Sequence, residues 1–200
     1  MTGSVAAILL AAGKSRRMGS CKQLLPLGES TVIGQCLEML VAAGIDEIVV
    51  VVSPEGEGVA EAARKYPVRI AANPEPEGDM ASSVRTGRDA LETAASGVLV
   101  FLCDYPLVSA GTVTTLIAGH AASPGSIIIP CHAEKRGHPL LFPRAILNEL
   151  ANDLILRDLV RRNPERVRCL DLDDLGVLLD MDTPEDYRRI RSMMQPLTSI

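Results

Sequence analysis

Four cations lie within nine residues of the chain, just after its first apolar segment: Lys14, Arg16, Arg17 and Lys22. Gly13 precedes them and Gly19 lies among them. Glycines allow a tight turn that brings backbone N–H groups close to an anion, and lysine and arginine add positive charge. The segment therefore predicts a phosphate-binding loop, in which Arg16 and Lys22 supply charge that matches a triphosphate.

This loop differs from the two common glycine-rich nucleotide loops. A Walker A loop has four residues between its first glycine and a G-K-[ST] end, whereas five residues separate Gly13 from Gly19 here, and Ser20 follows. The G-x-G-x-x-G fingerprint of dinucleotide-binding proteins is absent as well. The pattern indicates a phosphate loop of another class, and the alternative is a basic loop that is merely solvated.

An aspartate follows the most hydrophobic of the later apolar segments. Asp104 comes directly after residues 97–103. A carboxylate in this place is a typical metal ligand when phosphate oxygens and water fill the other coordination positions. The alternative is a structural role, in which Asp104 caps a helix that begins after Ser109.

Seven apolar segments rich in β-branched residues have the length of buried strands. They are residues 5–11, 47–53, 68–73, 97–103, 126–130, 139–143 and 167–172. Seven segments with helical periodicity alternate with them. These are residues 32–43, 58–65, 81–94, 111–121, 144–150, 154–162 and 184–194. The alternation predicts a three-layer α/β fold with a mostly parallel central sheet, because parallel strands require crossover connections.

The organisation of the chain favours one domain over residues 1–200. No linker, repeat or low-complexity tract interrupts the alternating pattern, and this length suits a single compact domain. In sheets of this kind, ligands bind where the carboxyl ends of the strands meet. The basic loop and Asp104 both follow predicted strands, so we expect them to meet at that edge.

Charge and composition argue against several classes of partner. The formal net charge is -5, so neither nucleic acid nor an anionic membrane surface is an expected partner, and the basic cluster suits a small anion. No apolar run approaches the roughly 20 residues of a membrane span, and no basic flank of a signal peptide precedes the first one. The 5 cysteines cannot all pair and show no C-x-x-C spacing, which favours the reducing cytoplasm.

Five motifs occur in order along the chain. They are LAAGKSRRMGSCK at 10–22, GDMASSVRTG at 78–87, FLCDYP at 101–106, GHP at 137–139 and DMDTPEDY at 180–187. As an ordered set they resemble the nucleotidyltransferases of the molybdenum cofactor cytidylyltransferase and guanylyltransferase group. The resemblance implies a Rossmann-like nucleotidyltransferase fold, Mg²⁺, and attack by a substrate phosphate on the α-phosphorus of a nucleoside triphosphate.

The resemblance also implies roles for the charged residues. This transfer is an in-line displacement without a protein nucleophile, so it depends on positioning and on neutralised charge. Arg16 and Lys22 are expected at the triphosphate and the departing pyrophosphate. Asp104 and Asp182 are expected to hold Mg²⁺. Asp180, two residues earlier on the same face of a strand, is expected to bind it directly or through water.

The two acidic residues of the last motif have a structural alternative. The sequence D-T-P-E-D is a good helix start, with Asp182 or Thr183 at the cap and Pro184 at the first helical position. Capping and metal binding are compatible when neighbouring residues perform them.

Nucleoside contacts implied by the resemblance fall on two segments: Leu10, Ala11, Ala12 and Gly13, and Gly78, Ser82 and Ser83. Gly78 would leave room for the nucleoside, and the serines would offer hydrogen bonds to base or ribose, or would only complete a helix N-terminus. His138 of the GHP motif would contact the acceptor substrate, or would be a hydrogen-bonded turn residue.

The donor and acceptor follow from the same resemblance. Guanine-using members tend to carry L-A-G-G where this chain has L-A-A-G at 10–13, and the methyl group of Ala12 narrows the space for a purine. CTP is therefore the expected donor and metal-loaded molybdopterin the expected acceptor, with a recipient molybdoenzyme as a further partner. The alternatives are transfer to a sugar phosphate or methylerythritol phosphate, and a non-catalytic chaperone that delivers molybdopterin.

Overall fold

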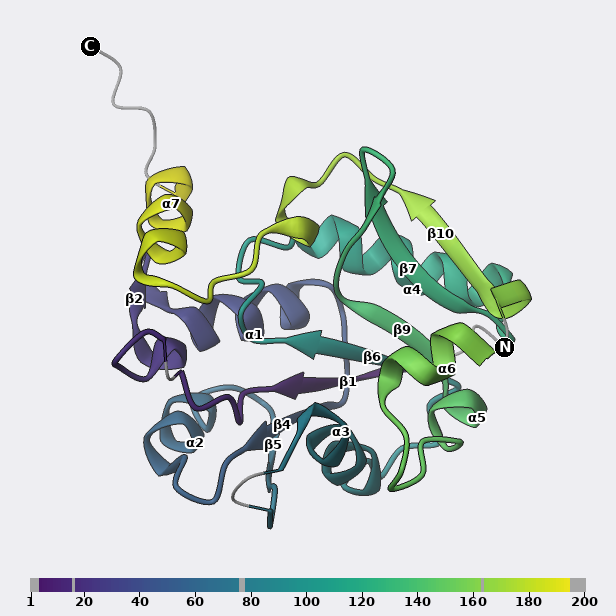
Figure 1. Cartoon of the computed structure of the whole chain (residues 1–200), viewed down its shortest axis with the longest axis horizontal. Helices are drawn as coiled ribbons and strands as arrows, with labels where there is room; N and C mark the ends of the chain where they lie inside the picture. Colours follow the sequence, from purple (N-terminus) through teal and green to yellow (C-terminus); the bar gives the residue numbers. More distant parts are fainter. Residues whose placement is uncertain (1–3, 16, 76–77, 163, 195–200) are drawn as a thin grey trace.

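A computed structural model describes residues 4–15, 17–75, 78–162 and 164–194 (Figure 1). Its main sheet has the strand order β10-β7-β9-β6-β1-β4-β5, and β8 pairs with β7. The strands are β1 (Val5–Leu10), β4 (Ile48–Val52), β5 (Arg69–Ala72), β6 (Gly97–Leu102), β7 (Ile127–His132), β8 (Lys135–Arg136), β9 (Leu140–Pro143) and β10 (Val167–Asp171). A separate hairpin joins β2 (Pro26–Leu27) to β3 (Ser30–Thr31).

Helices connect the strands. They are α1 (Val32–Ala42), α2 (Glu57–Ala63), α3 (Met80–Asp89), α4 (Ala110–Ala122), α5 (Arg144–Leu147), α6 (Leu156–Arg162) and α7 (Pro184–Met194). Three short 3-10 helices are η1 (Lys22–Leu24), η2 (Pro164–Arg166) and η3 (Leu175–Leu178). Within the described residues, no helix combines the length and the apolar character that crossing a membrane requires.

The sheet is mostly parallel, as the sequence predicts. β4, β1 and β6 run parallel side by side, β5 continues this set beyond β4, and β10 is parallel to β7. β9 is the exception, since it pairs antiparallel with both β6 and β7. Parallel strands end at one edge, so the loops after β1 and β6 emerge together: Cys103 N donates to Leu10 O at 3.1 Å.

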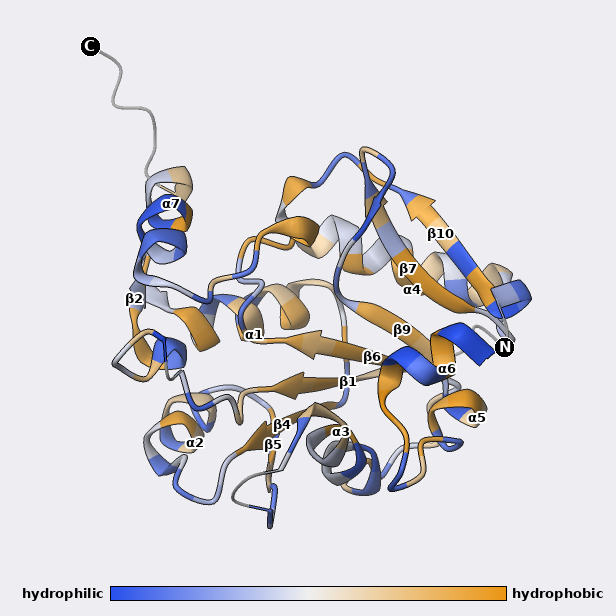
Figure 2. Cartoon of the chain, viewed as in Figure 1, coloured by the Kyte–Doolittle hydropathy of each residue, from blue (hydrophilic) through white to orange (hydrophobic). Residues whose placement is uncertain are grey.

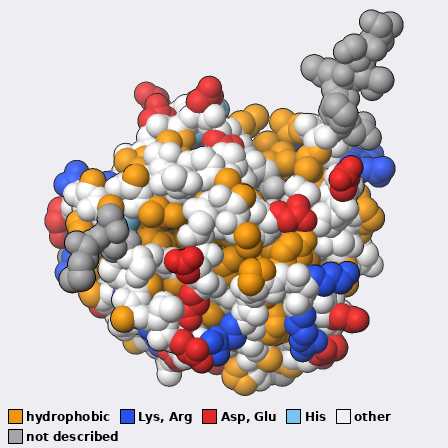
Figure 3. Space-filling model, turned by 180° about the vertical axis from the view of Figure 1, so that it is seen from behind, with side chains coloured by type: hydrophobic (Ala, Val, Ile, Leu, Met, Phe, Trp, Pro, Cys, Tyr) orange, Lys and Arg blue, Asp and Glu red, His pale blue; other side chains and the backbone are white. Residues whose placement is uncertain are grey.

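Both faces of the sheet are covered, and alternate residues of each strand belong to different cores. On one face, Ala7 and Leu9 of β1 pack with side chains of α1, α2 and α4. On the other, Ala6 and Ile8 pack with side chains of α3, α5 and α6. Figure 2 shows the central strands as hydrophobic, between helices that carry both hydrophilic and hydrophobic residues. The rear face in Figure 3 shows Lys and Arg scattered among Asp and Glu, with hydrophobic side chains between them.

The predicted strands and helices are all present, and the main differences lie at their ends and in the shortest elements. The helix predicted over 81–94 ends at Asp89, because the N–H groups of Glu92 and Thr93 donate to the Glu47 carboxylate instead of continuing the helix. Strands β2, β3 and β8 span two residues each, too short to give a periodic signal.

Close packing of α3 on the sheet generates the first prediction. A Cβ at Gly87 would lie 2.4 Å from Ile8 Cγ2 and 2.9 Å from Val51 Cγ2. Gly87→Ala should lower the free energy of unfolding by about 1–3 kcal/mol in urea, because the strand side chains must shift. Gly125→Ala is the control, since no atom lies within 4 Å of its added Cβ. Equal urea midpoints for the two variants would contradict this account of the packing.

Candidate active site

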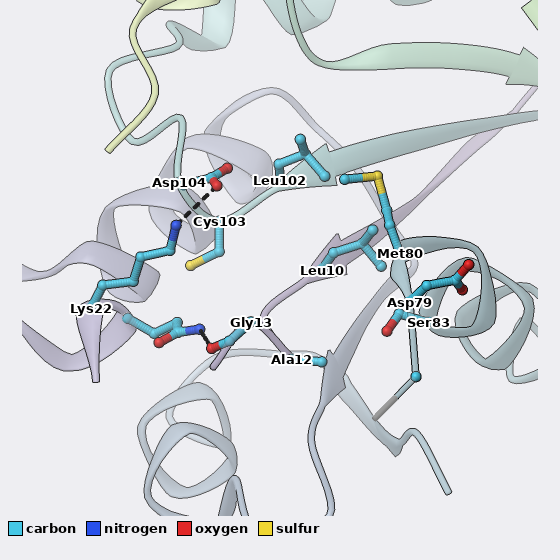
Figure 4. Close-up of a pocket in the computed structure, with 12 residues that line it drawn as sticks. Leu10, Ala12, Gly13, Lys22, Asp79, Met80, Ser83, Leu102, Cys103 and Asp104 are labelled. Atoms are coloured by element: carbon cyan, nitrogen blue, oxygen red, sulfur yellow. Dashed lines mark hydrogen bonds and ion pairs between the residues drawn. The ribbon is translucent and has the colours of Figure 1, made fainter. Parts of the chain in front are cut away.

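A cavity of about 190 Å³ opens at the carboxyl edge of the sheet, between the loops that follow β1 and β6 and the start of α3 (Figure 4). Its lining is Leu10, Ala12, Gly13, Lys22, Gln23, Gly78, Asp79, Met80, Ser83, Leu102, Cys103 and Asp104. Seven of the residues singled out from the sequence are in this set: Leu10, Ala12, Gly13, Lys22, Gly78, Ser83 and Asp104. Arg16 lies outside the described residues.

Lys22 lies at the centre of the charged side of this cavity. Its Nζ donates to Asp104 Oδ2 at 3.0 Å, to Asp182 Oδ1 at 3.0 Å and to the Met181 carbonyl at 3.1 Å. The residue is only 9% exposed. Burial by itself lowers the pKa of Lys22, but the Asp104 and Asp182 carboxylates outweigh burial and raise this pKa above its ordinary value. The ammonium therefore stays charged at neutral pH.

Asp182 is held beside Asp104 by the backbone. Met181 N donates to Asp104 O at 2.9 Å, which places the segment before α7 against the loop after β6. Arg17 Nη2 reaches Asp182 Oδ2 at 3.0 Å, so each oxygen of this carboxylate contacts a cation. Thr183 is the cap of α7, because its hydroxyl accepts from Asp186 N at 3.2 Å. Capping and charge pairing thus fall on neighbouring residues.

One carboxylate oxygen of Asp104 is available to bind a ligand. Oδ2 accepts from Lys22, whereas the buried Oδ1 has no hydrogen-bond partner among the described residues. The helix-cap alternative for Asp104 is wrong, because the cap of α4 is Ser109, which accepts from Thr112 N at 3.1 Å. An unpaired buried carboxylate oxygen next to a second carboxylate suits a hard divalent cation.

Asp180, the third carboxylate expected at the metal, does not lie where the sequence predicts. Asp180 is exposed and belongs to an irregular segment after η3, so the expectation that it lies on a strand with Asp182 is wrong. Burial is the main cause that raises the pKa of Tyr105 to about 12, and the charges of Asp180, Asp104 and Asp182 add to its effect. Among the residues that the structure describes, no group of three or more His, Cys, Asp or Glu side chains is arranged to hold a metal. A cation here would have carboxylates from Asp104 and Asp182, with the remaining ligands from phosphate and water.

Gln23 holds the loop after β1, and its role was not anticipated from the sequence. Its Nε2 donates to the carbonyls of Ala11 at 3.0 Å and Gly13 at 2.9 Å, and the residue is 2% exposed. Its Oε1 accepts from the hydroxyl of Ser15 at 3.3 Å. Ala11 itself is buried and does not line the cavity; its carbonyl serves this anchor. The only sequence signal for Gln23 is a polar residue before the apolar run LLPL.

Two serines and an asparagine shape the opposite wall. Asn73 Nδ2 donates to Ser82 Oγ at 2.8 Å and to Ser83 Oγ at 3.0 Å. Ser83 lines the cavity, whereas Ser82 belongs to the start of α3: its N–H donates to Asp79 Oδ1 at 2.8 Å and its hydroxyl to Asp79 O at 2.9 Å. A Cβ at Gly78 would lie 2.4 Å from Ser82 Oγ and 2.8 Å from Asn73 Nδ2, so a larger residue would displace these hydrogen-bonded side chains. The signal for Asn73 is its position as the last residue of the third predicted strand, directly after β5 in the structure.

A second cavity, of about 530 Å³, adjoins the first one through Asp79 and Met80, which line both. His138 forms part of its wall, and the His138 and Tyr105 rings lie 4.9 Å apart. Burial lowers the pKa of His138 and the Asp104 and Asp180 charges only partly oppose this, so the imidazole is neutral at neutral pH. The site therefore has a charged compartment joined to a larger, mostly apolar one.

Comparison with known families gives one match that spans most of the chain. The family model described as MobA-like NTP transferase domain matches residues 7–167. A curated relative, nicotine blue oxidoreductase of Paenarthrobacter nicotinovorans, is 30% identical over 93% of this chain and 96% of its own length.

Solved structures with the same fold include two informative proteins. Rv0371c of Mycobacterium tuberculosis H37Rv is 31% identical, with a TM-score of 0.81 over 94% of this chain and 98% of that one. A second structure of Rv0371c is a complex with manganese, at 27% identity and a TM-score of 0.77 over 96% of this chain and 100% of that one. A nucleotidyl transferase from Methanothermobacter thermautotroptrophicus is 25% identical, with a TM-score of 0.82 over 95% and 97% of the two chains.

The Gln23 anchor generates a prediction. Gln23→Leu should lower the free energy of unfolding by about 1–3 kcal/mol, because the Ala11 and Gly13 carbonyls lose their donor. Trypsin should also cleave the folded variant faster after Lys14 and Arg17, as followed by mass spectrometry. Gln35→Leu, the same change at a half-buried glutamine of α1, should leave this cleavage rate unchanged. A wild-type cleavage rate in Gln23→Leu would show that Gln23 does not hold the loop.

Proposed function

Because the chain belongs to the family of MobA-like NTP transferase domains, we propose that it is a Mg²⁺-dependent cytidylyltransferase whose acceptor is molybdenum-loaded molybdopterin. Family membership makes it a nucleotidyltransferase; the base, the metal ion and the acceptor are the proposal. The observation that carries it is the arrangement in which a buried lysine and two carboxylates meet at the edge of the sheet. These are the charges that a metal-bound triphosphate requires.

The reaction needs charge neutralisation more than proton transfer. An oxygen of the acceptor phosphate attacks the α-phosphorus of CTP, the bond to the bridging oxygen of the β-phosphate breaks, and pyrophosphate leaves with the electron pair. The attacking oxygen is already anionic at neutral pH, so no general base is needed. Mg²⁺, held by Asp104 and Asp182, would neutralise charge on the phosphate oxygens.

Several residues of this chain have proposed roles in binding the nucleotide. Lys22 is placed to bind the triphosphate and to stabilise the departing pyrophosphate, with Arg16 as its expected partner from the same loop. Gly13 and Ser83 line the same cavity, where backbone and hydroxyl groups would bind the nucleoside. Asp180 is exposed, and its charge acts on the pKa of Tyr105 and of His138. We therefore assign it to the surroundings of the metal rather than to direct ligation.

The choice of CTP rests on Ala12, which stands where guanine-using members of the resembling group tend to carry glycine. Ala12 lines the cavity, and its methyl group narrows the space there. A pyrimidine fits such a space better than a purine, although one methyl group discriminates by only about 1–3 kcal/mol. The donor is therefore the part of the proposal that a direct comparison of nucleotides should test first.

The acceptor is proposed to lie in the second cavity. Met80 is 50% exposed and Ile155 is 46% exposed, and both line this cavity from different segments. Arg136 and Arg157 also line it, and neither has an ion-pair partner among the described residues. An apolar cavity with free cations suits a flat ring system that carries phosphate better than it suits a sugar phosphate, whose hydroxyl groups would lack partners.

Other activities are less well supported by the site. A sugar phosphate or methylerythritol phosphate acceptor would not contact the apolar wall of the second cavity favourably. A delivery chaperone would have no need of the Lys22, Asp104 and Asp182 set. One relative is named as an oxidoreductase, but hydride transfer makes no use of paired metal-binding carboxylates beside a buried lysine.

Loss of a carboxylate gives the test of the proposed reaction. With molybdenum-loaded molybdopterin and Mg²⁺, the wild-type chain should release pyrophosphate from CTP in preference to GTP, ATP and UTP. Asp104→Asn should lower the rate with CTP on the order of 10²–10³-fold, because Mg²⁺ loses one of its carboxylates and the triphosphate loses the charge that neutralises it. Asp46→Asn, an exposed aspartate before β4 at the opposite edge of the sheet, should have no effect. Pyrophosphate release that is equal in wild type and Asp104→Asn would refute the assigned role.

The acceptor cavity has a separate prediction. Ile155→Glu should raise the KM for the acceptor on the order of tenfold, because a carboxylate in the apolar wall repels the acceptor phosphate, while the Kd of CTP stays the same. Val41→Glu is the matched control, since Val41 is 43% exposed on α1 and lies outside the cavity. Parallel changes in the acceptor KM and the CTP Kd would argue against a separate acceptor cavity.

A further inference from the structure

The metal-binding carboxylates are already paired with cations from one loop. Lys22 Nζ bridges Asp104 Oδ2 and Asp182 Oδ1, at 3.0 Å from each. Arg17 Nη2 contacts the other oxygen of Asp182, also at 3.0 Å. Only Asp104 Oδ1 is left without a partner among the described residues. We call this arrangement of Lys22, Arg17 and the two aspartates the cation bridge.

A divalent cation must compete with the cation bridge. The ammonium lies between the two carboxylates that Mg²⁺ would share, and a metal ion there would meet a like charge at close range. The site is partly buried, so solvent screens this repulsion poorly. Metal binding therefore requires that Lys22 give up its contacts with the carboxylates.

The triphosphate offers Lys22 another partner. Lys22 lines the first cavity, the proposed nucleotide cavity, and its ammonium points to Asp104 (Figure 4). Rotation of the side chain would bring the ammonium to phosphate oxygens bound in that cavity. The backbone is held meanwhile, because Lys22 N donates to Ser15 Oγ at 3.1 Å and the adjacent Gln23 anchors the loop. A bound triphosphate would draw Lys22 toward phosphate oxygens and leave the carboxylates to the metal.

We propose that the cation bridge substitutes for the metal ion until nucleotide arrives, so that metal and triphosphate bind cooperatively. This inference rests on the proposed function, because it takes Asp104 and Asp182 as the metal carboxylates. Lys22 is then a positioning residue for the metal as well as a ligand of the phosphates. It keeps the two carboxylates together without metal, and the coupling is reciprocal: metal tightens nucleotide binding by the same factor.

Binding of Mn²⁺, measured by electron paramagnetic resonance, tests the proposal without any turnover. Wild type should bind Mn²⁺ weakly alone and more tightly with a non-hydrolysable CTP analogue, after correction for Mn²⁺ bound by the free nucleotide. Lys22→Met should bind Mn²⁺ alone more tightly than wild type, on the order of tenfold or more, because the competing charge-assisted hydrogen bonds are gone. The enhancement by the analogue should shrink in the same variant.

Two further variants keep the test decisive. Arg17→Gln removes an exposed cation and should fold normally; it should tighten Mn²⁺ binding alone by roughly twofold to fivefold. Lys65→Gln removes an exposed lysine that follows α2, and should change Mn²⁺ binding less than twofold. If Lys22→Met does not fold, as judged by its urea transition, the Arg17→Gln result decides.

Two outcomes separate the failure of this inference from the failure of the proposed function. Mn²⁺ binding with the CTP analogue in wild type, but no tightening in Lys22→Met or Arg17→Gln, would overturn the cation bridge alone. No Mn²⁺ binding in any protein, even with the analogue, would overturn the metal site of the proposed function and the inference with it.

Discussion

The Lys22 ammonium joins three parts of the chain that are distant in sequence. It comes from the loop after β1, and its partners follow β6 and precede α7. Two carboxylates this close would repel each other, and the buried ammonium between them makes the arrangement stable. The geometry of the candidate site depends on this contact, because it fixes where Asp104 and Asp182 stand relative to the nucleotide cavity.

The sheet determines which residues the lysine can reach. β1 and β6 are paired in parallel register, so their following loops leave the same edge beside each other. α3 approaches β1 closely over Gly87, which brings the start of the helix and its Asp79 cap to that edge. Buried amides of Gln23 and Asn73 then hold the loop backbone and the serine hydroxyls. The amides of Gln23 and Asn73 thus fix two sides of the cavity, while Asp104 Oδ1 is left without a partner among the described residues.

Much of this arrangement was predictable from sequence because it rests on local patterns. The apolar runs gave the central strands, and the rule that loops converge at the carboxyl edge brought Lys22 and Asp104 together. Long-range contacts were less accessible: the antiparallel direction of β9 and the irregular segment at Asp180 have no local signal. Gln23 and Asn73 were missed because a buried amide that binds backbone and an exposed amide look alike in a sequence.

The central claim is that the α-phosphate of the nucleotide moves to the acceptor. The most direct measurement is the fate of radiolabel from CTP labelled at the α-phosphate, incubated with the chain, Mg²⁺ and molybdenum-loaded molybdopterin, and followed by chromatography. We expect this label to appear in a dinucleotide product, and label at the γ-phosphate to appear in pyrophosphate. Label that stays in CTP, although acceptor and nucleotide are both bound, would contradict nucleotidyl transfer to this acceptor.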